Sequence, residues 1–191
     1  MSERPVHDRD GLIAHVRGGG TAKYLFFWGH RAPRSGEVGK HFLSQWWPSP
    51  FQVDGATYPS AEHFMMAEKA RLFGDREAET RIMSAANPAA AKRAGRSVRD
   101  FDEGRWKAAR FDIVVRGSVA KFRQHPALGA YLLGTAERVL VEASPVDRIW
   151  GIGLSADDPR SLHPEQWPGL NLLGFALMEA RRCLASECSA L

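Results

Sequence analysis

The stretch Lys40–Phe73, KHFLSQWWPSPFQVDGATYPSAEHFMMAEKARLF, decides the fold. Residues 51–53 predict a short strand, and Asp54-Gly55 predicts a turn after it, because glycine tolerates the positive φ that such turns require. A second extended segment follows and ends at a proline. Ser60 is then a suitable helix N-cap, because its hydroxyl can accept from a backbone N–H of the first turn. A helix is therefore expected over residues 60–73.

Two charged residues of this helix, Glu62 and Lys69, are expected on one face, because seven residues make two helical turns. The same face or the adjoining one carries Met65, Met66 and Phe73. Two interpretations stay open for this pair. Glu62 and Lys69 can be a solvated pair that snorkels beside a buried stripe. Alternatively, they can be a catalytic carboxylate and a lysine that face a cleft.

Composition restricts the class of protein. The chain has 191 residues, enough for one domain with a full core, and ordinary charged and apolar fractions. No run is as long as a membrane span, and the N-terminus shows no signal-peptide pattern. Two cysteines are no disulfide framework, so a cytoplasmic location and no membrane partner are expected. The net charge of +4 is compatible with phosphate-bearing ligands.

The rest of the chain predicts an α+β protein: a single mostly helical domain with a small β-sheet. Residues 1–23 are polar and predict a flexible N-terminal arm, so the domain is expected over residues 24–191. Further helices are expected over residues 76–86, 89–95, 105–122, 126–134 and from 171 to about 184, and further strands over residues 24–28, 138–142 and 147–150.

Two segments outside the first stretch offer ligand contacts. The loop 29–39 holds Arg31 and Arg34, which are either solvated or a phosphate-binding rim, since guanidinium groups bind phosphate bidentately. In the helix expected over residues 105–122, one side is expected to carry Trp106, Ala109, Ile113 and Ala120. Trp106 on such a side is either a core residue or a wall on which a base stacks.

Two features near the C-terminal end suggest backbone contacts to a phosphate or ribose. Gly151 and Gly153 follow an expected strand, so they make either a tight turn or a place where bare amides approach a ligand. Asn171 is a suitable N-cap for the last helix, whose N-terminus also offers amides to an anion.

Familiar catalytic patterns are absent from the sequence. The seven histidines form no His-x-x-x-His pair, and no Cys-x-x-Cys pair, phosphate-binding lysine loop or nucleophile elbow occurs. Neither a metal nor a cofactor is expected. The remaining candidates for acid–base work are Glu62, His63, Lys69 and Asp147.

The chain resembles the NADAR superfamily, also called YbiA-like proteins. The resemblance spans about residues 24 to 185 and is carried by FLSQWWPSPFQVDGATYPSAEHFMMAEKA, by Arg105-Trp106-Lys107, by DRIWGIGL at 147–154 and by GLNLLG at 169–174. It implies an N-glycosidase without a cofactor. Family members hydrolyse ribosylamino-pyrimidine phosphates of riboflavin synthesis, or remove ADP-ribose from guanine in DNA beside an ADP-ribosyltransferase.

The resemblance also implies site positions. It assigns active-site or ligand-contact positions to Glu62, Lys69, Trp106, Asp147, Trp150, Gly151 and Asn171. The expected partners are phosphorylated ribosyl or ADP-ribosyl substrates, with ADP-ribosylated DNA as one candidate. Riboflavin enzymes or an ADP-ribosyltransferase are the proteins expected to be encoded by neighbouring genes.

Two chemical routes fit these residues. In one, Lys69 attacks ribose C1′ and forms a Schiff base while Glu62 transfers protons. In the other, Glu62 orients water and stabilises an oxocarbenium-like state, and Lys69 only binds phosphate or tunes Glu62. A module that binds ADP-ribose or NAD without turnover is the alternative to an enzyme. A purely structural partner protein is disfavoured, because Glu62 and Lys69 share an otherwise apolar face.

Overall fold

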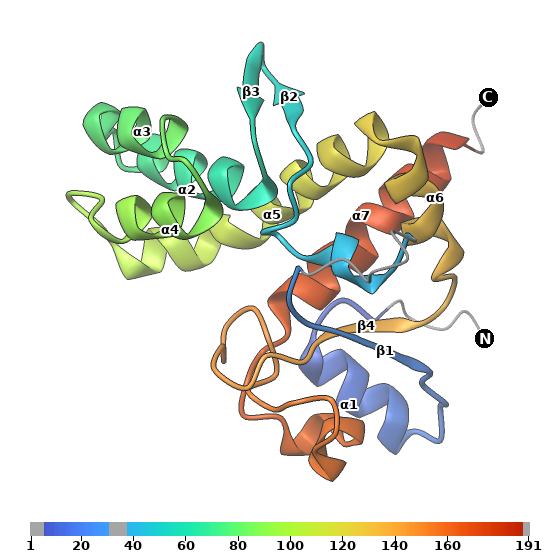
Figure 1. Cartoon of the computed structure of the whole chain (residues 1–191). Coiled ribbons are helices and arrows are strands. Elements are labelled where there is room, and N and C mark those ends of the chain that lie inside the picture. The colour runs from blue at the N-terminus through green and yellow to red at the C-terminus, as the bar shows by residue number, and fades with distance from the viewer. Residues whose placement is uncertain (1–5, 31–37, 189–191) are drawn as a thin grey trace. The chain divides into compact units, whose positions relative to one another are not determined.

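The structure is a computed structural model that describes residues 6–30 and 38–188 (Figure 1). The chain divides into two compact units, and each is described by itself. The first unit consists of Met1–Ser44 and Ala130–Leu191, and the second consists of Gln45–Gly129. The second unit is therefore an insertion into the sequence of the first.

The first unit is built on two parallel strands. Strand β1 (Tyr24–Phe27) pairs with β4 (Val139–Glu142), with Tyr24 opposite Val139. Parallel strands need a long connection, and here the connection contains the whole second unit. Helix α7 (Leu172–Cys188) packs on β4 so closely that a Cβ at Gly174 would meet the Leu140 carbonyl oxygen.

Residues 9–17 form a helix, and the prediction of a flexible arm over residues 1–23 was wrong there. Helix α1 (Arg9–Arg17) begins after Asp8, whose carboxylate accepts from the Gly11 amide at 2.7 Å. Leu12 is completely buried, and the Arg9 guanidinium donates to the Trp167 carbonyl. The buried Leu12 and the Asp8 cap stabilise a helix in a segment whose sequence is mostly polar. The short 3-10 helices η2 (Pro159–Leu162) and η3 (Pro164–Gln166) complete this region.

Helix α2 (Ala61–Leu72) is central to the second unit. It contacts α3 (Arg76–Met83), α4 (Pro88–Arg96) and α5 (Glu103–Gln124), which surround it in Figure 1. The run Ala61–Ala67 is entirely buried, as a helix covered on several sides requires. Ser60 is its N-cap as expected, with Oγ accepting from the His63 amide.

The hairpin before α2 is also confirmed. Strands β2 (Phe51–Val53) and β3 (Ala56–Tyr58) are antiparallel, and the turn residues Asp54 and Gly55 have φ values of 50° and 79°. These positive values are those of the tight hairpin turn that Asp-Gly favours.

The α+β class is confirmed, with two small sheets instead of one. The 3-10 helix η1 (Lys40–Leu43) precedes the hairpin, and α6 (Pro126–Gly134) has the predicted bounds. The helix expected over 76–86 ends at Met83, where Ser84 closes it with bonds back to Ile82 and Thr80. The strand expected over 147–150 does not form, because Asp147 bends the chain into a turn there. None of the described helices is long and apolar enough to cross a membrane.

Helix α5 buries a different side from the one predicted. The buried residues are Trp106, Arg110, Val114, Gly117, Ser118, Lys121 and Phe122. Ala109, Ile113 and Ala120, which were expected beside Trp106, are only half-buried. The predicted side contained no charged residue and no glycine. Gly117 is needed at the contact, since a Cβ there would lie 2.5 Å from the Phe64 ring.

Candidate functional site

Helix α2 places two predicted site residues at opposite ends. Glu62 lies in the first turn with only 2% of its surface exposed, and its amide donates to the Gln45 carbonyl at 3.0 Å. Lys69 is half-buried two turns later. Seven residues separate their Cα atoms by about 10 Å along the helix axis. The spacing suits two groups that act on different atoms of one ligand.

The Lys69 ammonium lies against a backbone carbonyl and two aromatic rings. Its Nζ donates to the Gly95 carbonyl at 2.9 Å and lies 4.2 Å from the centre of the Phe101 ring and 5.6 Å from that of Trp106. Burial lowers the pKa of Lys69, and the Glu103 carboxylate opposes this by raising it. The net lowering makes the neutral, nucleophilic amine more accessible than in a free lysine.

Aromatic rings form the wall beside this amine. We call Lys69, Phe73, Phe101 and Trp106 the Lys69 cluster. The Phe73 and Phe101 rings pack edge to face with centroids 5.3 Å apart, and Trp106 is 8% exposed. Phe101 is 43% exposed, which is unusual for a large apolar side chain in contact with a half-buried lysine. The cluster thus presents an aromatic surface to solvent beside a reactive group.

His63 has a structural role. Its Nδ1 lies 2.8 Å from the Ser60 hydroxyl, and its Nε2 lies 3.1 Å from the Ala85 carbonyl. The ring is buried, and burial lowers the pKa of His63. Both ring nitrogens are therefore engaged in holding the start of α2 against the end of α3.

The other predicted residues belong to the first unit. Asp147 Oδ1 accepts from the amides of Ile149 and Trp150 at 2.9 and 2.8 Å, so the carboxylate closes a turn. Trp150 is half-buried. Asn171 is completely buried, with Nδ2 donating to the Leu140 carbonyl and Oδ1 accepting from the Glu142 amide. Its side chain braces β4 rather than capping α7.

The two glycines allow the loop to pack closely. A Cβ at Gly151 would lie 2.8 Å from the Glu142 carbonyl oxygen, and Gly153 has a φ of 72°. The Asn171 amide donates to the Gly151 carbonyl at 3.1 Å. The structure therefore brings Asp147, Trp150, Gly151, Gly153 and Asn171 into one bonded loop region of the first unit. Glu62, Lys69 and Trp106 belong to the second unit, and Arg31 and Arg34 lie outside the described residues.

Sequence analysis missed three contributors in the second unit. They are the Gly95 carbonyl, Phe101 and Arg110, a buried arginine of α5. Arg110 follows Trp106 by four residues, so helical spacing alone could have placed the two on one face. Phe101 and Gly95 lie in or beside short connections, where periodicity carries no signal.

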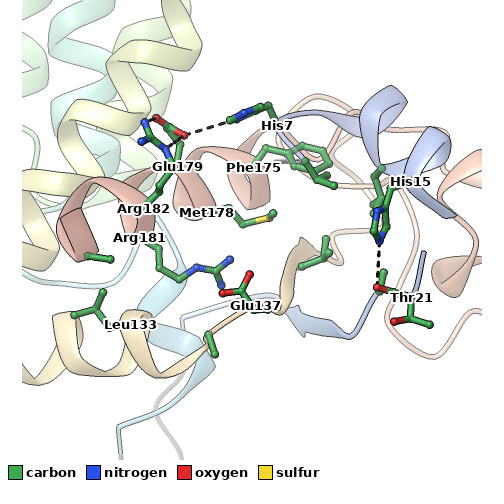
Figure 2. A pocket seen from close by; sticks show the side chains of 16 residues that line it. His7, His15, Thr21, Leu133, Glu137, Phe175, Met178, Glu179, Arg181 and Arg182 are labelled. Atoms are coloured by element: carbon green, nitrogen blue, oxygen red, sulfur yellow. Dashed lines mark hydrogen bonds and ion pairs between the residues drawn. The ribbon is translucent and has the colours of Figure 1, made fainter. Parts of the chain in front are cut away.

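A pocket of about 600 Å³ lies elsewhere, in the first unit (Figure 2). Its apolar lining includes Phe175 and Met178, and its polar groups already bond one another. Glu179 pairs with Arg182 and lies 3.8 Å from His7, while Arg181 donates to Thr135. The predicted site residues in the described part of the chain do not line this pocket. The same part of the chain contains no group of three or more His, Cys, Asp or Glu residues suited to a metal ion.

Comparison with known proteins places these observations in a family. A protein-family model described as the NADAR domain matches residues 26–185. The chain is 45% identical to N-glycosidase R617 of Acanthamoeba polyphaga mimivirus over 166 residues, which are 84% of this chain and 96% of that protein. It is 35% identical to N-glycosidase YbiA of Escherichia coli (strain K12) over 138 residues, which are 72% of this chain and 78% of YbiA.

A solved structure and a plant protein extend the comparison. The NMR structure of Escherichia coli YbiA superposes with a TM-score of 0.65 and 28% identity, covering 88% of this chain and 89% of YbiA. The riboflavin biosynthesis protein PYRR, chloroplastic, of Zea mays is 35% identical over 135 residues, which are 67% of this chain and 20% of that protein.

Proposed function

The chain belongs to the NADAR family and is a hydrolase of N-glycosyl bonds, and we propose that it acts on phosphorylated ribosylamines. In these substrates ribose C1′ is bonded to an exocyclic amine of a base. Two candidates share this chemistry: ribosylamino-pyrimidine phosphates of riboflavin synthesis, and guanine that carries ADP-ribose in DNA. The similarity to a plant riboflavin protein favours the pyrimidine. A cytoplasmic location is part of the proposal.

The observation that carries the proposal is the environment of Lys69. An amine that donates to one carbonyl, lies against two aromatic rings and has a lowered pKa is suited to attack an electrophilic carbon. Trp106 and Phe101 offer flat apolar surface beside that amine, on which a base can stack. A lysine that only bound phosphate would gain nothing from losing its proton.

The proposed step begins from the ring-opened glycosylamine, which is an imine of C1′. The neutral Lys69 amine adds to C1′ and forms a new C–N bond, the C=N double bond becomes single, and one lysine N–H proton passes to the former imine nitrogen. Glu62, in its protonated form, donates a proton to the departing nitrogen, so the bond to the base breaks and the base leaves as an amine. The lysine is then joined to C1′ as an iminium ion. Water adds to this ion and returns a proton to the Glu62 carboxylate. The resulting carbinolamine then collapses, with its hydroxyl proton passing to the lysine nitrogen, so the sugar is released as an aldehyde and the Lys69 amine is restored.

The tests also distinguish a second chemical route from this one. In that route Glu62 activates water for direct attack on C1′, and Lys69 supplies charge alone. Within the second unit, Trp106 is proposed as a further contact for the substrate. The contacts expected from the region of Asp147, Trp150, Gly151, Gly153 and Asn171, and from Arg31 and Arg34, stay predictions. Within that region Asn171 is proposed to act through the backbone it braces, because both polar atoms of its side chain are bonded to β4.

The test compares the protein with its Glu62→Gln variant on two substrates, ribosylaminouracil phosphate and DNA ADP-ribosylated on guanine. Released base and released sugar are identified by mass spectrometry. The expected result is turnover of the pyrimidine by the wild type and a loss of about 100-fold or more in Glu62→Gln, the scale of a general acid or base. Glu77→Gln is the matched control, because the Glu77 carboxylate lies on the surface and pairs with Arg81.

The other outcomes separate the alternatives. Turnover of the DNA alone would make the protein a reversal enzyme for ADP-ribosylation. Turnover of neither substrate, together with tight binding of ADP-ribose, would contradict the proposal and support a binding module.

A further inference from the structure

Arg110 is a largely buried arginine that the mechanism above does not use. It lies in α5 and is only 6% exposed. Among the residues that the structure describes, none forms a hydrogen bond or ion pair with its guanidinium group. None of its nitrogens is among the fully buried side-chain atoms without a partner, so the guanidinium keeps contact with solvent although the residue as a whole is buried. A guanidinium that is held in place by packing and has free donors is available to bind an anion.

The other arginines of the same helix show the contrast. Arg105 donates to the Leu72 carbonyl at 2.9 Å, and Arg116 pairs with the Glu68 carboxylate. Both are exposed, whereas Arg110 is buried. Of these three arginines, Arg110 is therefore the one that packing holds most closely and the one that has no partner within the described chain.

Arg110 lies on the side of α5 that packs against α2. Four residues before it, Trp106 contacts Lys69, and seven residues after it, Gly117 packs against Phe64 of α2. Residues four apart on a helix share a face and are separated by about 6 Å along the axis. Arg110 is thus the next residue on this face after the Trp106 wall of the Lys69 cluster, at a distance on the scale of one ribose phosphate.

The chemistry of the group defines its ligand. A guanidinium is a planar fork of donors that binds an oxyanion such as phosphate bidentately. The distribution of charge along the chain is consistent with an anionic ligand. Residues 45–129 hold 14 of the chain's 26 lysines and arginines and 10 of its 22 aspartates and glutamates, so they carry the whole net charge of +4. The second unit is therefore the part of the chain that attracts an anion.

We propose that Arg110 binds the phosphate of the substrate and makes the enzyme selective for phosphorylated ribosylamines. This inference rests on the proposed function for the identity of the substrate, but anion binding by Arg110 does not depend on turnover. With the phosphate held by Arg110, the sugar lies across the Trp106 face, and C1′ is directed towards Lys69.

The test is a cycle of two variants and two substrates. Ribosylaminouracil phosphate and its dephosphorylated form are assayed with the wild type and with Arg110→Met, which keeps the length of the stem. We expect Arg110→Met to lower kcat/KM about 10- to 100-fold on the phosphorylated substrate, the range for hydrogen bonds to charged groups, and to leave the dephosphorylated substrate unchanged. Arg116→Met, which removes an exposed arginine of the same helix, should change kcat/KM by the same factor for both substrates.

Equal losses on both substrates would overturn the proposal, because they would show a structural role for Arg110. Arg110→Lys is a second variant for the case in which Arg110→Met does not fold. It keeps the positive charge but lacks the two parallel N–H donors of the guanidinium. It should fold and recover only part of the selectivity.

A binding measurement separates this inference from the proposed function. Titration calorimetry with ribose 5-phosphate and with ribose should show binding of the phosphate ester to the wild type and a loss of about 10-fold or more in Arg110→Met. If neither glycosylamine is hydrolysed but this difference is seen, Arg110 is the anion site and the proposed function fails. If hydrolysis is seen but Arg110→Met binds ribose 5-phosphate as the wild type does, the inference about Arg110 fails.

Discussion

At the scale of single residues, Lys69 shows how surroundings change an ordinary side chain. Burial against Phe101 and Trp106 lowers its pKa, so the neutral amine becomes populated at a lower pH than in a free lysine. The rate should therefore fall on the acidic side of the profile, where Lys69 is protonated. Glu103 acts in the opposite direction, because a nearby carboxylate favours the ammonium form.

Replacement of Glu103 tests this balance. In Glu103→Gln the carboxylate no longer favours the protonated form, so the pKa of Lys69 falls further. The acidic limb of the kcat/KM profile should move to lower pH, by a fraction of a pH unit because Glu103 is exposed to solvent. Profiles of Glu103→Gln and of the control Glu77→Gln would be compared at constant ionic strength. If the acidic limb moves equally in both variants, or moves towards higher pH, Lys69 is not the group that titrates in this limb.

At the scale of elements, Gly174 tests the contact between α7 and β4. A methyl group at this position would meet the Leu140 backbone oxygen, and two packed backbones have little freedom to yield. Gly174→Ala should lower the free energy of unfolding by about 2–3 kcal/mol. Gly134→Ala is the matched control, because nothing lies within 4 Å of its added Cβ. That variant should change stability by less than about 1 kcal/mol. Denaturant titrations of both variants would measure the difference, and equal effects would contradict the packing.

Asp75 makes the stability of the second unit depend on pH. Its carboxylate accepts from the Arg99 amide, the Ala78 amide and the Arg99 guanidinium, and these bonds hold the pKa of Asp75 well below its usual range. The folded state then binds fewer protons than the unfolded state. This contribution is fully present above the unfolded pKa of about 4 and is lost as the pH falls through the lower folded value.

The corresponding variant is Asp75→Asn. It should lower the melting temperature at pH 7 and flatten the fall in stability between about pH 4 and pH 2. Thermal melts of the wild type and the variant across this range measure both effects. Parallel curves for the two proteins would show that Asp75 is not the group responsible.

Local signals explain which elements the sequence could predict. The hairpin at 51–58 and the start of α2 follow from Asp54-Gly55 and Ser60, whose chemistry acts within a few residues. Helix α1 was missed because its tertiary contacts, with η3 and from Arg9 to the Trp167 carbonyl, are made with residues distant in the sequence. Arg110 was missed because charged residues are normally assigned to exposed faces, and only tertiary packing shows that this one is buried.

At the scale of the whole molecule, one compact unit is inserted into the chain of the other. The segments entering and leaving the second unit are joined near its ends. Gln52 and Gln124 exchange two hydrogen bonds of 2.9 and 2.8 Å, and His125 lies 2.8 Å from the Pro50 carbonyl. The inserted unit also has a core of its own, in which Phe51, Tyr58 and Phe64 pack against one another.

These features predict that residues 45–129 fold as an isolated fragment. The fragment should show helical circular dichroism and a single cooperative melt, because the joined ends keep the cost of closing the unit low. A variant fragment with Gln124→Ala should melt at a lower temperature. A fragment without helical signal would show that the inserted unit depends on the rest of the chain.

The central claim is that Lys69 forms a covalent bond with ribose C1′ during hydrolysis of an N-glycosyl bond. Borohydride reduction during turnover of ribosylaminouracil phosphate tests it most directly, with peptide mass spectrometry to locate the adduct. We predict a reduced sugar phosphate on Lys69 in the wild type and no adduct in Lys69→Arg, which keeps the charge but not the nucleophile. Hydrolysis by the wild type without any adduct, together with activity in Lys69→Arg, would contradict the claim and support direct attack by water activated by Glu62.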